Sequence, residues 1–237
     1  MVKICGLMKT TLLDYPGHVA CTIFMGGCNL RCPFCHNAEL LDAGLPAAYT
    51  EEEIMGFLNK RKRTLEGVAI SGGEPTLQRD LPAFIKRIRE ETGLEIKLDT
   101  NGTNPDMLAA LMEDGLLDYA AMDIKAGESG YARLCGVSAE NLHFSAILKS
   151  RDLLLAGRIP YEFRTTVVDG LHTASDFEEI GPFIQGCERY YLQAFQDSDH
   201  VLCRAAGYGT PTREKLLQYA ALLEPYVGSV QLRGVEE

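Results

Sequence analysis

The sequence contains no tryptophan and no apolar run long enough to span a bilayer, and its first residues lack the hydrophobic segment of a secretory signal peptide. We therefore expect a cytoplasmic protein that does not enter a membrane. Basic residues are outnumbered by acidic ones, 23 to 33, so the formal net charge is -10 and general electrostatic binding to nucleic acid has no basis. The one basic run, Lys60 to Arg63, ends a predicted helix, where cations favour the exposed carbonyl groups.

Cysteines that could form a disulfide framework are also lacking, because five of the eight stand singly along the chain. These are Cys5, Cys21, Cys135, Cys187 and Cys203. Without an export signal, the sequence predicts that all eight stay reduced. The remaining three form a C-x3-C-x2-C run just after an apolar segment, at Cys28, Cys32 and Cys35.

Three thiolates four and three residues apart can bind one compact iron-sulfur cluster. A [4Fe-4S] cluster ordinarily takes four such ligands, so three would leave one iron with an open site for a small molecule. A structural zinc site is the main alternative, and it needs a fourth ligand. His36 adjoins Cys35 and would strain the loop, and no second C-x2-C pair follows. The triad favours a single iron-sulfur cluster but leaves zinc open.

Apolar runs alternate with amphipathic segments, as in a parallel sheet built from repeated βα units. The predicted strands are 18–25, 67–71, 94–99, 118–124, 160–168, 189–195 and 228–232. One predicted helix begins at Thr50, whose capping box is completed by Glu53, and the others span 81–91, 105–113, 140–156, 174–185 and 212–226. We predict an α/β fold, a partial, open TIM-like (β/α)6 barrel that forms a single domain over residues 1–237.

Polar and glycine-rich motifs follow several predicted strands directly. They are the cysteine loop, Gly72-Gly73-Glu74, Asp99-Thr100-Asn101-Gly102 and Asp123-Ile124-Lys125. Because the carboxyl ends of strands in a β/α barrel form one rim, at which active sites are built, we expect these motifs to converge there.

The same motifs carry a resemblance to a known family. The stretch from Gly6 to Leu40 contains Asp14-Tyr15-Pro16-Gly17, the cysteine triad with Phe34 inside it, and His36-Asn37. With the later motifs in order, the chain resembles radical S-adenosylmethionine (SAM) enzymes, in particular glycyl-radical-enzyme activases. It is most similar to the activating proteins of anaerobic ribonucleoside-triphosphate reductase in their long form, which resemble pyruvate formate-lyase activating enzyme.

This resemblance implies a radical SAM barrel with a [4Fe-4S] cluster on Cys28, Cys32 and Cys35 that cleaves SAM with one electron. The resulting radical would abstract hydrogen from a glycine of a partner glycyl radical enzyme. It implies a protein partner of that kind and a reduced flavodoxin or ferredoxin-type electron donor.

The resemblance also assigns SAM-binding residues. Gly72, Gly73 and Glu74 would hold the methionine end, since a Gly-Gly turn lets backbone groups approach closely. The remaining candidates are Phe34 and His36 beside the adenine, Arg164 at the carboxylate or ribose, and Asn101, Asp123 and Lys125. From the residues alone, the Gly-Gly pair is a turn, Phe34 is packing, His36 is a surface or cluster-shielding residue, and Arg164 could instead form an internal salt bridge.

Asp99 and Asp123 end neighbouring predicted strands, where two like charges raise a pKa or recruit a cation. The resemblance implies a monovalent cation between them, whereas the simpler interpretation is that each caps a loop. Lys125 is assigned with the cysteine triad to catalysis and to contact with SAM or the incoming peptide. The resemblance also implies that Asp14 forms a hydrogen bond with the glycine loop of the partner protein.

Three alternatives remain at this stage. The chain could act on a different glycyl radical enzyme of the formate-lyase type, or on a small molecule such as a deazapurine precursor, because deazaguanine-forming synthases share the triad and the Gly-Gly-Glu. It could also be a zinc-stabilised binding module without catalysis. Four histidines have no ligand spacing and are interpreted as structural, namely His18, His143, His172 and His200.

Overall fold

The structure is a computed structural model that describes residues 1–235. One sheet contains eight strands in chain order: β1 (Ile4–Thr11), β2 (Ala20–Met25), β3 (Gly67–Gly72), β4 (Glu95–Thr100), β5 (Tyr119–Asp123), β6 (Tyr161–Val167), β7 (Tyr190–Ala194) and β8 (Val230–Arg233). Strand β1 is antiparallel to β2, and β2 to β8 are all parallel. Strands β1 and β8 do not pair with each other, so the barrel is open as predicted.

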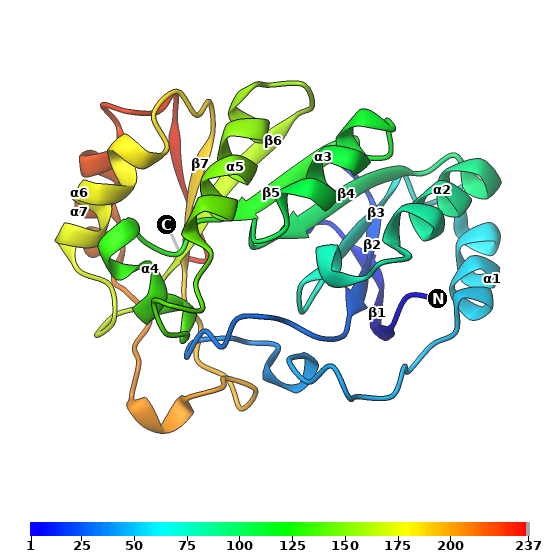
Figure 1. The fold of residues 1–237 in the computed structure, drawn as a ribbon, viewed down its shortest axis with the longest axis horizontal. Helices are drawn as coiled ribbons and strands as arrows, with labels where there is room; N and C mark the ends of the chain where they lie inside the picture. The colour runs from blue at the N-terminus through cyan, green and yellow to red at the C-terminus, as the bar shows by residue number, and fades with distance from the viewer. Residues whose placement is uncertain (236–237) are drawn as a thin grey trace.

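Six crossovers connect the parallel strands, and each carries a helix (Figure 1). These helices are α1 (Glu51–Arg61), α2 (Leu81–Thr92), α3 (Pro105–Glu113), α5 (Phe144–Leu155), α6 (Ala174–Phe183) and α7 (Arg213–Leu223). An additional helix, α4 (Glu128–Cys135), precedes α5, and 3-10 turns lie at Ala38–Leu40, Pro75–Leu77 and Arg204–Ala206. The predicted (β/α)6 arrangement is therefore confirmed. No helix within residues 1–235 is long and apolar enough to cross a membrane.

The two faces of the sheet differ in polarity because strand side chains alternate. Side chains on the helix-covered face are fully buried and apolar, for example Ile23, Ile70, Leu98, Met122 and Phe163. Their neighbours in sequence face the inside of the barrel and are mostly polar there, namely Thr22, Ser71, Lys97, Asp99, Asp123, Arg164, Thr166 and Gln193. The main core thus lies between sheet and helices, and the inside of the barrel is left for chemistry.

Aromatic packing fills the barrel at the amino ends of its parallel strands. Tyr15, in the turn after β1, is buried against Ala20 and Tyr119, the first residues of β2 and β5. A Cβ at Gly67, the first residue of β3, would lie 2.7 Å from the Tyr15 ring, so this position requires glycine. The cavity lies toward the opposite, carboxyl end of the strands.

Two elements differ from the sequence-based expectations. Strand β1 was not predicted, because its sequence ICGLMKTT lacks alternation and much of it stays partly exposed at the sheet edge. The predicted helix 140–156 begins only at Phe144, and helix α4 precedes it. Helix α4 has eight residues and ends at Gly136, which has φ +64. The capping box of α1 is confirmed, with Glu53 N donating to Thr50 Oγ1 at 3.2 Å.

A buried ion pair connects the last strand, β8, to the inside of the barrel. Arg233 on β8 donates from both terminal nitrogens to Glu162 on β6, at 2.8 and 2.9 Å, and Glu162 is fully buried. The Arg233 guanidinium also lies 3.4 Å from the Tyr191 ring centroid. Because Tyr191 is on the intervening strand β7, this group of three side chains connects the last three strands.

We expect Arg233→Met to destabilise the protein by about 2–4 kcal/mol, because it leaves a buried carboxylate without its cation. Denaturant unfolding monitored by circular dichroism measures this change. The double variant Glu162→Gln with Arg233→Met should recover part of the loss, and Arg213→Met, at an exposed arginine, is the matched control. Equal stability of Arg233→Met and the control would contradict the assigned role of the pair.

Candidate active site

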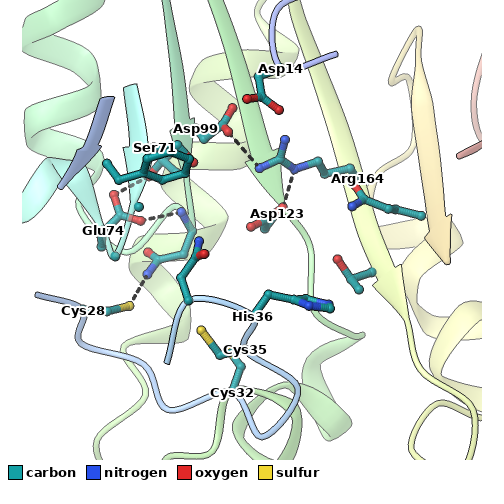
Figure 2. A pocket seen from close by; sticks show the side chains of 18 of the residues that line it. Asp14, Cys28, Cys32, Cys35, His36, Ser71, Glu74, Asp99, Asp123 and Arg164 are labelled. Carbon is teal, nitrogen blue, oxygen red and sulfur yellow. Dashed lines mark hydrogen bonds and ion pairs between the residues drawn. The ribbon is translucent and has the colours of Figure 1, made fainter. Parts of the chain in front are cut away.

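A cavity of about 790 Å³ lies at the carboxyl ends of the strands, where the sequence motifs were expected to converge. Figure 2 shows the cysteines along one side of it, Asp14 along the opposite side, and Arg164 with two aspartates between them. All of the candidate site residues line this cavity, namely Asp14, Cys28, Cys32, Phe34, Cys35, His36, Gly72, Gly73, Glu74, Asp99, Asn101, Asp123, Lys125 and Arg164.

The cysteine loop is fixed by backbone hydrogen bonds from three directions. Its base is closed by Gly27 N, which donates to Leu40 O at 2.7 Å. The C-terminal end of α4 accepts from the loop, since Arg31 N donates to Cys135 O at 2.9 Å. A segment near the C-terminus donates to it, from Leu202 N to Cys35 O at 3.1 Å and from Cys203 N to Pro33 O at 2.9 Å. The loop therefore has a defined shape.

The three thiols of the loop are free and differ in their electrostatic surroundings. Burial raises the pKa of Cys28 to about 11 and also raises the pKa of Cys35. The neighbouring Cys135 thiol lowers the pKa of Cys32 below its ordinary value. Within residues 1–235, no group of three or more His, Cys, Asp or Glu side chains is placed to hold a single metal ion. Three soft sulfur donors on one wall of a cavity fit a thiolate-bound cluster.

The Gly-Gly pair after β3 is required by close backbone contacts. A Cβ at Gly72, which has φ +114, would lie 2.4 Å from Met25 N, and a Cβ at Gly73 would lie 2.1 Å from Gly27 O. Hydrogen bonds from Gly73 N to Met25 O and from Glu74 N to Gly27 O, both 2.8 Å, join this turn to the end of β2. The turn therefore packs directly on the start of the cysteine loop.

Glu74 is fully buried, and its carboxylate is occupied by protein donors. Its Oε1 accepts from the hydroxyls of Thr76 and Thr100, at 2.6 and 2.8 Å, and its Oε2 accepts from Asn101 N at 2.6 Å. Burial raises the pKa of this carboxyl despite these bonds. The Glu74 side chain therefore connects the end of β3 to the end of β4. The predicted contact of Glu74 with SAM is thus limited to its backbone. Asn101 extends the connection, because its Nδ2 donates to Asn29 Oδ1 at 3.1 Å on the cysteine loop.

A chain of ion pairs crosses the inside of the barrel from β4 to the residues after β5. The Lys97 ammonium donates to Asp99 Oδ1, and Arg164 Nη2 lies 3.3 Å from Asp99 Oδ2. Arg164 Nε donates to Asp123 Oδ1 at 2.6 Å (Figure 2). Lys125 Nζ donates to Asp123 Oδ2 at 3.1 Å. The internal salt bridge considered for Arg164 is thus present, and neither aspartate is a loop cap.

This arrangement sets the charge of the cavity wall. Burial opposes ionisation of Asp99 and Asp123, but the neighbouring cations outweigh it, and the pKa of each carboxyl is held below its ordinary value. Burial likewise disfavours the ammonium of Lys125, yet Asp123 raises its pKa above the ordinary value. Three cationic side chains face two carboxylates, so the group carries a net positive charge in a protein of net charge -10.

Aromatic and imidazole rings complete the wall beside Cys35. Phe34 is buried, with its ring 5.8 Å from Lys125 Nζ and 6.0 Å from the His172 ring. His36 lies 5.0 Å from the ring of Phe195, and burial lowers its pKa. His172 is a hydrogen-bonded core group as expected, with Val168 N donating to its Nδ1 at 3.1 Å and its Nε2 lying 3.1 Å from Lys125 O.

Asp14 is at the opposite wall, on the connection between β1 and β2. Its Oδ2 accepts from the Thr22 hydroxyl, and Thr11 Oγ1 accepts from Asp14 N at 3.2 Å. Two neighbouring leucines project into solvent, since Leu12 and Leu13 are 70% and 87% exposed. An acidic side chain with an exposed apolar pair therefore stands at the edge of the cavity.

Three residues of the site were missed by the sequence-based reasoning. Lys97 could have been found, because it lies two residues before Asp99 and strand alternation places both on one face. Arg233 and Cys135 gave no such signal, since their contacts depend on how β8 and α4 fold back. In particular, Cys135 lies beside Cys32 and is not an isolated core cysteine.

An open β/α barrel with three cysteines on one rim loop defines an enzyme that builds a redox site at the carboxyl ends of its strands. The sequence model of the Radical SAM superfamily matches residues 22–180. The chain therefore belongs to the radical SAM superfamily, and it is an enzyme. Membership implies a [4Fe-4S] cluster and SAM, so the zinc-stabilised binding module is set aside.

Individual proteins of this superfamily are also similar to the chain. A Methanocaldococcus jannaschii protein named as a candidate glycyl-radical enzyme activating enzyme is 31% identical over 234 residues, 98% of this chain and 96% of that protein. The pyruvate formate-lyase-activating enzyme of Clostridium pasteurianum is 30% identical over 141 residues, 57% of this chain and 58% of that protein. The crystal structure of a radical SAM methyltransferase from Sphaerobacter thermophilus has a TM-score of 0.72 at 18% identity, covering 92% and 67% of the two chains. At that identity it shows the shared fold alone.

We expect replacement of Cys28, Cys32 or Cys35 by Ala to abolish cluster retention, because two thiolates do not hold a [4Fe-4S] cluster. Anaerobic iron and sulfide analysis measures the retained cluster. Cys203→Ala, at an exposed thiol, and Cys187→Ala, in the core, are the controls and should keep their iron. Loss of iron from either control would contradict the assignment of a single cluster.

His172 should make the stability of the protein depend on pH. Burial lowers the pKa of His172 to about 4 in the folded state, from an ordinary value of 6.5. The unfolded state therefore binds a proton at higher pH than the folded state, and stability falls as the pH drops from about 6.5 to about 4, by up to about 3 kcal/mol. Urea unfolding at several pH values measures this slope. His172→Gln should remove most of the slope, whereas His200→Gln, at an exposed histidine, should leave it unchanged.

Proposed function

We propose that this radical SAM enzyme is a glycyl-radical-enzyme activase that abstracts a hydrogen atom from a backbone glycine of a partner protein. The observation that carries the proposal is the cavity of about 790 Å³, which has the cysteine loop on one wall and Asp14 beside exposed leucines at the opposite edge. Similarity to an activating-enzyme relative over 98% of the chain supports it. We propose that residues 1–237 act as one domain, because a single sheet extends from residue 4 to residue 233.

In the proposed reaction, a bound [4Fe-4S] cluster reduced by a flavodoxin or ferredoxin-type donor would supply the one electron for cleavage of SAM to methionine and a carbon radical, which would take a hydrogen atom from the glycine and end as 5′-deoxyadenosine. Cys28, Cys32 and Cys35 would hold the cluster. The backbone of Gly72 and Gly73 would approach the methionine end of SAM, and Asn101 keeps this region attached to the cysteine loop. Phe34 and His36 would line the adenine side.

The cationic side chains of the barrel interior would orient the charged parts of SAM. Arg164 is held by two carboxylates, so its guanidinium has a fixed position from which to bind a carboxylate or ribose oxygen. Lys125 is fixed by Asp123 and packs over Phe34, between the cysteine loop and the interior. A monovalent cation beside Asp99 and Asp123 stays a prediction. The Lys97 ammonium already donates to Asp99 Oδ1, so a free cation there would share this carboxylate with Lys97.

For the partner, we propose an anaerobic ribonucleoside-triphosphate reductase. Support comes from the ordered set of motifs, Asp14-Tyr15-Pro16-Gly17, Asp99-Thr100-Asn101-Gly102 and Asp123-Ile124-Lys125. We propose a cytoplasmic location, since a thiolate-bound cluster requires reduced cysteines. Two alternatives would replace the reductase as the substrate. One is a glycyl radical enzyme of the formate-lyase type, and the other is a small molecule.

We expect Asp14→Ala to separate two activities that the cysteine variants lose together. Reductive cleavage of SAM in the absence of the partner protein should persist, because Asp14 lies on the opposite side of the cavity from the cysteines (Figure 2). Formation of the glycyl radical on the reductase should fall about 10- to 100-fold, the loss expected for a hydrogen bond to a charged group. Electron paramagnetic resonance measures the radical, and chromatography of 5′-deoxyadenosine measures cleavage.

The matched control is Asp114→Ala, at an exposed aspartate just after α3, which should leave both activities unchanged. Equal loss of both activities in Asp14→Ala would show that Asp14 supports the cluster or SAM instead of the partner. A wild-type enzyme that cleaves SAM but produces no glycyl radical on the reductase would remove that partner from the proposal.

A further inference from the structure

Lys97 is a buried cation to which neither the sequence motifs nor the proposed reaction gives a role. It lies in the middle of β4, its side chain is 1% exposed, and its ammonium donates to Asp99 Oδ1. In the register of the sheet, Lys97 is opposite Ala69 on β3 and Tyr119 on β5, and Asp99 is opposite Ala121 on β5. The two alanines leave space along the inner face for the Lys97 side chain to extend toward Asp99. Because an unpaired buried ammonium is costly, the Lys97 contact with Asp99 must offset its burial.

The four carboxylate oxygens of Asp99 and Asp123 are each matched by a cationic side chain. Lys97 is on Asp99 Oδ1, Arg164 is on Asp99 Oδ2 and Asp123 Oδ1, and Lys125 is on Asp123 Oδ2. A free cation next to Asp99 would therefore have to compete with these groups for the carboxylate oxygens. An alkylammonium group carries the same charge as sodium or potassium, and it donates hydrogen bonds to carboxylate oxygens that a metal cation would instead coordinate.

We propose that Lys97 is a built-in counter-ion for Asp99, which occupies the place of a free monovalent cation and makes this site independent of sodium and potassium. Lys97 acts as a positioning residue, because its ammonium holds Asp99, and Asp99 in turn holds Arg164 in place at the cavity wall. The consequence for SAM binding rests on the proposed function, whereas the counter-ion role itself does not.

The counter-ion role is tested on cluster-free full-length protein with Lys97→Met, which keeps most of the length of the side chain but removes its charge. Thermal unfolding is compared in sodium, potassium and choline chloride at equal ionic strength, about 0.1 M, so that general screening is the same in each. We expect the wild type to melt at one temperature in all three salts. The variant should melt about 5–10 °C lower in choline and regain much of this loss in sodium or potassium.

Three further variants identify the charge as the cause. Lys97→Met combined with Asp99→Asn removes both charges and should show no difference between salts. Lys97→Gln keeps a donor to Asp99 without a charge and should respond to alkali cations like Lys97→Met, so it decides the matter if Lys97→Met fails to fold. Lys86→Met, at an exposed lysine 3.9 Å from Glu90, is the matched control and should not respond.

Titration of SAM onto cluster-loaded protein tests the consequence for binding. The wild-type Kd should agree among the three salts, and Lys97→Met should bind about tenfold more weakly in choline, with recovery in potassium or sodium. Alkali dependence of the wild type, or lack of it in both uncharged variants, would overturn the counter-ion role. Absence of SAM binding by the wild type in every salt would instead refute the proposed function, and the unfolding experiment would still decide the role of Lys97.

Discussion

The organisation of the site depends on one constraint: the inside of the barrel is charged, and each buried charge there needs a partner of opposite sign. Lys97, Asp99, Arg164, Asp123 and Lys125 alternate in sign across β4, β5 and β6. Each group is buried or half-buried, and removal of any one takes away a charged partner from at least one neighbour. The positions of Arg164 and Lys125 are therefore fixed by their neighbours before any ligand binds.

The glycine turn after β3 couples this charged interior to the cysteine loop. Gly72 and Gly73 allow the turn to approach β2 and Gly27 so closely that no side chain fits. Glu74 then uses its whole carboxylate to bind the end of β4. The Glu74 carboxylate thus connects two strand ends, while contact of its backbone with SAM stays a prediction.

Much of this arrangement could be predicted from the sequence. The parallel strands, the open barrel and the convergence of the cysteine, glycine and aspartate motifs follow from alternating hydrophobicity and from the rule that strand ends share one rim. Strand β1 could not be predicted, because it is stabilised by pairing with β2 and has no alternation of its own. Helix α4 is short, and its role in supporting the loop through Cys135 depends on tertiary contacts.

Side-chain partners were harder to predict than positions. Asp99 and Asp123 were placed correctly at neighbouring strand ends, but their partners were not, since Lys97 was overlooked and Arg164 was expected to face SAM or to form an internal salt bridge. A sequence shows which residues share a face of a strand. It does not show which ion pairs form when a charged side chain has several possible partners on adjacent strands.

The backbone hydrogen bonds from Leu202 and Cys203 to the cysteine loop have a consequence for biosynthesis. During translation the cysteines leave the ribosome long before these residues exist. The loop therefore acquires its final shape only after the C-terminal part of the barrel has folded. Delivery of iron and sulfide to a correctly shaped loop is thus a late step, and the nascent chain has to carry its exposed thiols in reduced form until residues 202 and 203 have been synthesised and have folded against the loop.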